Sequence, residues 1–245
     1  MRYLLLALVV LFQSPFAMSQ ERETIFICTD TSSWPPYFYP MGNTWQGLDL
    51  KLIDNIFVSA NVTYQMNPLP WKRCLESVKK GEDYQVALSA TYNSLRDKHY
   101  HISNKYYSLT PAYVKKSAMF AKEEVENIAS LFEKDRKVCG IAGFNYSHFF
   151  SESDQRLFKE LAQNAKTFQQ LLNQVNYGRC DIGLTRHETM LSLKSLELVD
   201  WDSELELERL PGGEPENYFM LISKNIADSR WLLEVVNKGI EDFVK

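Results

Sequence analysis

The chain has 245 residues and, with histidine counted as neutral, a formal net charge of −4 at pH 7. It contains no long run of like charges, which argues against nucleic acid or an anionic membrane surface as the main partner. Aromatic residues make up 13% of the chain, and many of them stand beside Pro, Gly or Asn, a placement typical of rings that line a recess.

Residues 1–19 have the features of a cleaved secretory signal peptide. Arg2 supplies the charged start, residues 4–12 form an unbroken apolar run, and residues 17–19 form a small-x-small cleavage site. The apolar run is shorter than the ~20 residues that a membrane-spanning helix needs. We therefore expect a periplasmic protein that is exported and then cleaved, and a retained N-terminal anchor is the alternative interpretation.

The first half of the mature chain alternates short β-rich runs with amphipathic helical stretches. Strands and helices are predicted in turn at residues 24–28, 47–60, 62–66, 71–80 and 85–89. This alternation indicates a mainly parallel sheet that is covered by helices on both faces.

A long extended segment near residues 113–120 separates this series from a second one of the same kind. The second series has predicted strands at 137–141 and 181–184 around a helix at 168–177, and it ends with an extended run at 218–222 and a last amphipathic helix. We therefore expect an α/β protein of two lobes joined by two crossing strands. Lobe 1 is expected to comprise residues 20–116 and 220–245, and lobe 2 residues 117–219. The cleft between two such lobes is a favoured ligand site.

Four cysteines are an even number in a chain expected to reach an oxidising compartment. Cys28 and Cys74 fall in the first predicted lobe, and Cys139 and Cys180 fall in the second. Of the three pairings that four cysteines allow, we therefore favour Cys28–Cys74 and Cys139–Cys180. Buried free thiols are the alternative. A zinc site is less favoured because neither C-x-x-C nor H-x-x-x-H spacing occurs.

Several short motifs occur in the same order and spacing as in one known family. They are Pro35-Pro36-Tyr37, residues 47–53, Trp71-Lys72-Arg73, Gly81, Ser94-Leu95-Arg96, Gly143 and residues 178–181. Through them the chain resembles the bacterial periplasmic solute-binding proteins of family 3, the polar amino-acid type. The resemblance implies the two-lobe fold of the type II periplasmic binding proteins, with no cofactor and no metal.

In lobe 1 the resemblance implies that Arg96 clamps a ligand carboxylate, with hydrogen bonds added by Thr91 and Ser89. A guanidinium suits this role because its planar fork matches a carboxylate and stays charged. The alternative for Arg96 is a surface ion pair with Asp97. The other candidate ligand-binding residues of this lobe are Tyr37, Trp71 and Arg73. The alternative is that the two aromatic residues fill the core and that Arg73 lies at the surface.

In lobe 2 the loop that follows the strand at 137–141 is expected to offer backbone N–H groups to the ligand, together with Asn145 and Tyr146. The family's usual Ser or Thr is replaced here by Phe144. Arg186 is the larger departure, because related binders carry an acid there that holds the ligand's ammonium group, which a cation would repel. If Arg186 faces the cleft, it favours a ligand with more negative than positive charge. The alternative is that it points away.

These observations predict a monomeric protein that closes on a small carboxylate-bearing solute and delivers it to an ABC permease. A ligand sensor for a membrane receptor uses the same closure and is the alternative. A periplasmic dehydratase of the same fold is a further one, with Glu188, His187 and His148 as candidate acids or bases.

Overall fold

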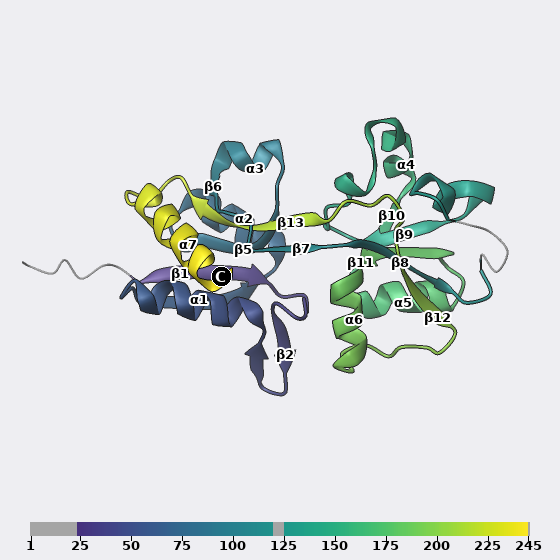
Figure 1. The fold of residues 1–245 in the computed structure, drawn as a ribbon, viewed down its shortest axis with the longest axis horizontal. Helices are drawn as coiled ribbons and strands as arrows, with labels where there is room; N and C mark the ends of the chain where they lie inside the picture. Colours follow the sequence, from purple (N-terminus) through teal and green to yellow (C-terminus); the bar gives the residue numbers. More distant parts are fainter. Residues whose placement is uncertain (1–23, 120–124, 245) are drawn as a thin grey trace, which may run out of the picture.

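A computed structural model describes residues 24–119 and 125–244 (Figure 1). The predicted signal peptide at residues 1–19 lies outside the described residues. Within the described part of the chain, no helix is both long and apolar enough to cross a bilayer. Two α/β lobes lie side by side and are joined by extended segments, so the predicted fold class is confirmed.

The first lobe is built on a six-stranded sheet. In spatial order its strands are β4 (Tyr64–Leu69), β1 (Ile25–Asp30), β5 (Val86–Thr91), β13 (Glu216–Ser223) and β6 (Tyr100–Ile102), and β7 (Tyr107–Leu109) also pairs with β13. The pairings of β1 with β4 and β5 are parallel, whereas β13 runs antiparallel to β5. The sheet is thus parallel where strand and helix alternate and antiparallel where the chain returns from the second lobe.

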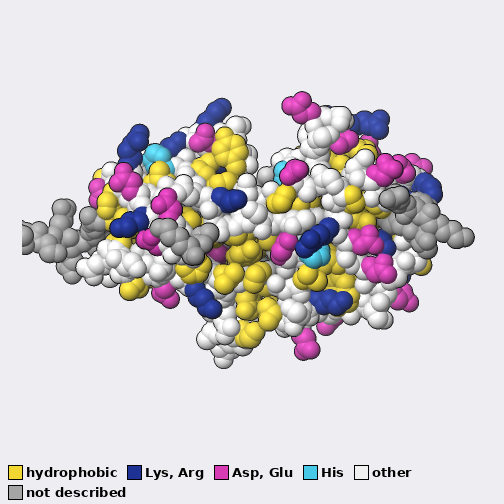
Figure 2. All heavy atoms as spheres, viewed as in Figure 1, with side chains coloured by type: hydrophobic (Ala, Val, Ile, Leu, Met, Phe, Trp, Pro, Cys, Tyr) yellow, Lys and Arg dark blue, Asp and Glu magenta, His cyan; other side chains and the backbone are white. Residues whose placement is uncertain are grey.

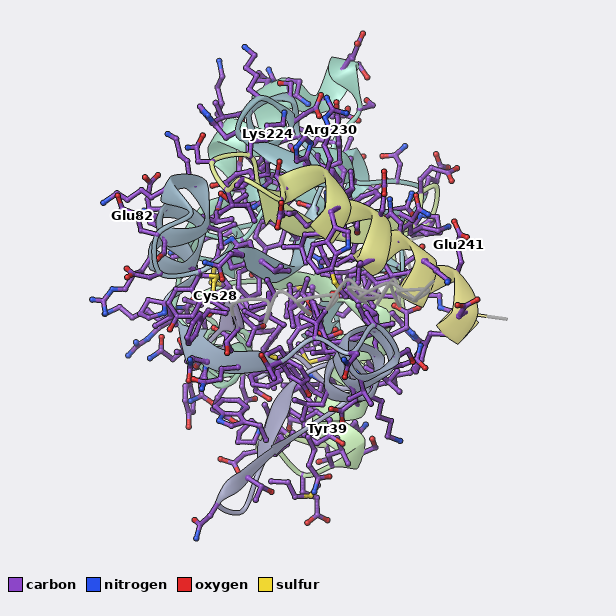
Figure 3. The ribbon with its side chains drawn as sticks, turned by 90° about the vertical axis from the view of Figure 1, so that its left-hand side faces the viewer. Cys28, Tyr39, Glu82, Lys224, Arg230 and Glu241 are labelled. Atoms are coloured by element: carbon purple, nitrogen blue, oxygen red, sulfur yellow. A yellow bond between two sulfur atoms is a disulfide. The ribbon has the colours of Figure 1, made fainter. Side chains whose placement is uncertain are left out.

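Helices cover both faces of this sheet because successive side chains of a strand point to opposite faces. Ile27 of β1 packs against α1 (Leu48–Ser59) and α7 (Ser229–Val244), while its neighbour Cys28 packs against α2 (Trp71–Lys80) on the other face. Figure 3 shows α7 lying across the end of this lobe. A short hairpin of β2 (Tyr39–Met41) and β3 (Thr44–Gln46), which the sequence did not predict, projects below it.

The second lobe has a five-stranded sheet. Its spatial order is β10 (Ala162–Ala165), β9 (Val138–Ile141), β11 (Ile182–Arg186), β8 (Pro111–Lys116) and β12 (Leu205–Arg209). One face packs on α5 (Phe168–Asn176) and α6 (His187–Ser195). The other face is covered by η1 (Ala129–Asp135), η2 (Ser147–Phe149) and the segment with η3 (Glu152–Asp154) and α4 (Gln155–Glu160).

Strand pairing bears on the expected lobe boundaries at residues 116 and 219. All of β8 pairs with β11 and β12 in the second sheet, whereas β13 already pairs with β7 at Glu216 in the first. We therefore propose that the chain crosses between lobes at Thr110 and again between Arg209 and Glu216.

Charges of both signs are mixed over the visible face of both lobes, without a large patch of one sign (Figure 2). This distribution agrees with the low net charge of the chain.

Both predicted disulfides are present. Cys28 bonds to Cys74 and Cys139 bonds to Cys180, with Cα–Cα distances of 5.7 and 6.0 Å. The first bond ties β1 to α2 (Figure 3) and the second ties β9 to the residues just before β11. Free thiols and a zinc site are therefore the wrong alternatives for these four residues.

Removal of the first disulfide should destabilise the protein. The sequence separation of Cys28 and Cys74 is 46 residues. Removing a crosslink that closes a loop of this size raises the entropy of the unfolded chain and typically lowers the free energy of unfolding by about 2–5 kcal/mol. We expect the Cys28→Ala/Cys74→Ala variant to lose this amount of unfolding free energy in urea titrations at equilibrium. The oxidised parent treated with reductant should lose at least as much. A loss below about 1 kcal/mol would contradict this account.

Candidate ligand-binding site

A pocket of about 540 Å³, including its open mouth, lies between the two lobes. Its walls come from the carboxyl ends of strands and from the loops that follow them, where ligands bind in open α/β sheets. The residues that line it are Thr29, Asp30, Ser32, Trp34, Trp71, Leu88, Ser89, Thr91, Arg96, Gly143, Phe144, Asn145, Arg186 and Tyr218.

Arg96 is held at this pocket by its own lobe. It lies in α3 (Ser94–His99), a short helix whose N-terminus is capped by the Asn93 side chain, which accepts a hydrogen bond from the Arg96 backbone N–H at 2.7 Å. Its Nη1 donates to the carbonyl and to the hydroxyl of Thr91, at 2.5 and 2.8 Å. The guanidinium lies 5.6 Å from the centre of the Trp71 ring. It forms no ion pair with Asp97 or any other described acid.

This geometry leaves Nε and Nη2 of Arg96 without a partner among the described residues. Burial lowers the pKa of Arg96, because a charge that is removed from water is less stable. A ligand carboxylate at these two donors would restore the lost solvation with a bidentate, charge-assisted pair.

Thr91 and Asn145 make a direct contact between the lobes. The Asn145 side-chain amide, from the loop after β9, donates to the Thr91 hydroxyl at 3.1 Å. The same hydroxyl accepts from Arg96. The two lobes thus meet beside the Arg96 guanidinium, where a bound carboxylate would touch both.

Ser89 lines the pocket, but its hydroxyl donates to the Asp49 carboxylate at 2.8 Å. Its backbone N–H donates to the Tyr106 hydroxyl at 2.9 Å. Asp49 is fully buried in the first turn of α1. That helix can start here because Gly47 has a φ of +135°, and a Cβ at Gly47 would meet the Tyr37 carbonyl oxygen at 1.9 Å. The Ser89 hydrogen is therefore used inside the first lobe.

Arg186 faces the pocket and is almost fully buried, with 2% exposure. Its Nε and Nη2 donate to the same oxygen of Glu216, at 3.0 and 2.8 Å, and Nη2 also donates to the Asn145 carbonyl at 2.5 Å. Burial would lower the pKa of Arg186, but neighbouring Tyr218 and Glu216 outweigh it and hold this pKa above its usual value. Nη1 is buried and has no hydrogen-bond partner among the described residues.

Glu216 makes its hydrogen bonds through one carboxylate oxygen, Oε2. Besides the two bonds from Arg186, it accepts a hydrogen bond from the Tyr218 hydroxyl at 2.7 Å, and its other oxygen lies 2.9 Å from His148 Nδ1. Burial would raise the pKa of Glu216, but Arg186 and the His148 and Tyr218 hydrogen bonds outweigh it and lower this pKa. Four aromatic rings lie within 6.0 Å of the Arg186 guanidinium: Trp34, Phe144, Tyr146 and Phe149.

Three of the predicted site residues lie outside the pocket lining. The Tyr37 ring stacks on Tyr107, with centroids 3.5 Å apart. The buried Tyr146 accepts a hydrogen bond from the Ile141 backbone at 2.8 Å. Arg73 is exposed in the first turn of α2. The predicted residues that do line the pocket are Trp71, Ser89, Thr91, Arg96, Asn145 and Arg186.

The candidate acids and bases for catalysis also lie outside the lining. Both oxygens of Glu188 accept from Thr110, one from its backbone N–H and one from its hydroxyl, each at 2.8 Å. The Nδ1 of His148 lies 2.9 Å from a Glu216 oxygen. Burial lowers the pKa of His187. In the described part of the chain, no group of three His, Cys, Asp or Glu side chains could hold a metal ion.

Sequence reasoning missed pocket residues on the first strand and on the returning strand. Asp30 ends β1 and accepts a hydrogen bond from the Ser32 backbone at 3.0 Å, and Tyr218 lies on β13. The turn residues that follow the first predicted strand were the available signal for Asp30. Nothing local marked Tyr218, because its place depends on the pairing of β13 with β5.

Asp49 makes stability depend on pH. Burial raises the pKa of its carboxyl to about 7, against the hydrogen bonds from Ser89 and Tyr106 that lower it. Between the ordinary aspartate pKa of about 4 and this value, the folded protein keeps a proton that the unfolded chain releases, so stability falls as pH rises. We expect the melting temperature to fall less between about pH 5 and about pH 8 in Asp49→Asn than in the parent.

The matched control is Asp83→Asn, a change at an exposed acid of the same lobe, which should reproduce the parent's pH profile. Equal pH profiles for Asp49→Asn and the parent would show that Asp49 does not titrate in this way.

Residues 25–138 match the family described as bacterial extracellular solute-binding proteins, family 3. No curated protein matches the chain. Among solved structures, the arginine-, lysine-, histidine-binding protein ArtJ from Geobacillus stearothermophilus has a TM-score of 0.70 at 17% identity, over 91% of this chain and 90% of that one.

Two further structures are similar to the same degree. A Streptococcus pneumoniae ABC uptake transporter substrate-binding protein with bound histidine has a TM-score of 0.71 at 18% identity, over 91% of this chain and 87% of that one. The ancestral amino acid-binding protein AncCDT-1, a precursor of cyclohexadienyl dehydratase, has a TM-score of 0.70 at 16% identity, over 90% and 89%. At these identities the similarity establishes the shared fold.

Proposed function

Because residues 25–138 carry the family 3 solute-binding sequence within this two-lobe fold, we propose that the protein binds a small carboxylate-bearing solute between its lobes in the periplasm. It then presents the closed, loaded form to an ABC permease. The protein works as a monomer that is exported through the signal peptide expected at residues 1–19. The lobe boundaries proposed above make Thr110 and residues 210–215 the segments about which it opens and closes.

The observation that carries this proposal is the state of Arg96. Two of its guanidinium nitrogens have no partner in the described chain, and the third is fixed by Thr91. A half-buried guanidinium with a fixed orientation and open donors, at the wall of an interlobe pocket, is arranged to receive a carboxylate.

Closure follows from contacts that only the closed form makes. Asn145 reaches Thr91 across the pocket, so a ligand at Arg96 touches both lobes only when they are together. A ligand that binds the closed state better shifts the population toward it. A membrane receptor that binds the same closed state is the alternative partner. We prefer the role in solute uptake because a protein of the same fold is named as a component of an ABC uptake transporter.

The binding role is favoured over a dehydratase-like activity by the position of the acids and bases. Glu188 accepts hydrogen bonds from Thr110 through both oxygens, His148 lies beside Glu216, and neither residue lines the pocket. A general acid or base has to reach the reacting group.

A thermal-shift screen of residues 20–245 with amino acids, carboxylic acids and short peptides should identify the solute class, since a ligand that binds only the folded protein raises its melting temperature. For the best ligand, we expect Arg96→Ala to cost roughly 2–5 kcal/mol of binding free energy by isothermal titration calorimetry, as for the loss of one partner of a buried charge pair.

The control is Arg230→Ala, which removes an exposed arginine of α7 that does not line the pocket (Figure 3). It should leave the affinity unchanged. The proposal fails if no carboxylate raises the melting temperature, or if the bound acid keeps its affinity in the Arg96→Ala variant.

A further inference from the structure

We infer that Arg186 is a second anion-binding residue of this pocket, and that the solute is a short dicarboxylate that lacks an ammonium group. One carboxylate pairs with Arg96 in the first lobe, and the other with Nη1 of Arg186 in the second. This inference rests on the proposed function and names the class of solute.

The first support is the unsatisfied nitrogen of Arg186. Its Nε and Nη2 are used by Glu216 and the Asn145 carbonyl, whereas Nη1 has no partner although the side chain is almost fully buried and lines the pocket. Buried donors are nearly always paired, because an unpaired one loses its bonds to water without replacement. A ligand oxygen that reaches Nη1 of Arg186 from the pocket would supply the missing hydrogen-bond acceptor.

The second support is the absence of an acid in the second lobe's part of the lining. That part consists of Gly143, Phe144, Asn145 and Arg186. Glu216 lies outside the lining, where its Oε2 accepts from Arg186 and Tyr218 and its Oε1 lies 2.9 Å from His148 Nδ1. An ammonium group beside Arg186 would be repelled without a free carboxylate to compensate.

Asp30 is the one acid in the pocket lining. It belongs to the first lobe, as Arg96 does, and it accepts a hydrogen bond from Ser32 in its own turn. Burial raises its pKa, against the hydrogen bonds from Ser32 and Thr31 that lower it. Two arginines line the pocket with this one acid: Arg96 has no ion-pair partner among the described residues, and Arg186 keeps one open donor, Nη1, beside its bonds to Glu216.

The third support is the short path between the two guanidiniums. Asn145 accepts from Arg186 through its backbone carbonyl and donates to Thr91 through its side-chain amide, and that Thr91 hydroxyl accepts from Arg96. Two residues, Asn145 and Thr91, thus bridge the space between the two arginines. A dicarboxylate with a short carbon body is long enough to reach both.

The walls between the two cations suit a carbon body. Trp71 lies against Arg96, and Trp34 and Phe144 lie against Arg186. The Trp34 and Phe144 rings meet edge to face, with centroids 5.3 Å apart. Aromatic faces gain from contact with methylene or ring carbons.

The test compares three probes with the same five-carbon body on residues 20–245: glutarate with two carboxylates, pentanoate with one, and glutamate with an added ammonium. Calorimetry should give glutarate a dissociation constant at least about tenfold below those of pentanoate and glutamate. Phthalate against benzoate repeats the comparison with a flat body.

The decisive variant is Arg186→Gln/Glu216→Gln, which removes both partners so that neither charge is left buried alone. The ratio of the pentanoate to the glutarate dissociation constant should fall below about threefold in this variant. The Arg230→Gln change, at an exposed residue of α7, should keep the full advantage. Circular dichroism and the melting temperature check that each variant is folded.

The inference is overturned if glutamate binds as well as or better than glutarate, or if the double variant keeps the preference for two carboxylates. Those results leave the proposed function standing, because a carboxylate still binds and still depends on Arg96. Failure of all five acids to bind overturns the inference as well, and the broader screen with Arg96→Ala then decides whether the proposed function falls with it.

Discussion

The buried ion pair between Arg186 and Glu216 is the interaction on which the rest of the site depends. Arg186 ends β11 of the second sheet, and Glu216 begins the strand that returns to the first lobe. Taking two charges out of water is costly, and the pair is tolerable only because further polar groups share it. The Asn145 carbonyl and the Tyr218 hydroxyl supply those bonds, which fixes the loop and the crossing strand on either side of the pocket.

A second buried carboxylate organises the first lobe in a different way. Asp49 has no cation beside it and relies on the Ser89 hydroxyl and on Tyr106, so burial dominates and its proton is retained to about pH 7. The two acids differ because Glu216 faces a guanidinium whereas Asp49 faces hydroxyl groups. The first-lobe wall of the pocket around Ser89 therefore carries little charge. The second-lobe wall carries the charge of Arg186, which is paired with Glu216.

Sequence pattern predicted the elements that carry strong periodicity. The alternation of strands and helices around Cys28 and Cys74, and again around Cys139 and Cys180, assigned each pair to one lobe, and both disulfides formed accordingly. Segments of low hydrophobicity were not predicted as strands. The strand Leu205–Arg209 alternates Leu with Glu and was missed, because its acids are paired across the sheet with Lys115 of β8.

By itself, the sequence determined the α/β class, the two-lobe division and the cysteine partners, since these follow from local periodicity and composition. The candidate arginines were named by its resemblance to a known family. Only the tertiary structure decided which candidates meet. Tyr37, Arg73 and Tyr146 lie outside the pocket, while Arg186 enters it. Arg186 is paired there with Glu216, 30 residues away along the chain. Strand pairing brings these residues together, and no local pattern encodes a contact made across two sheets.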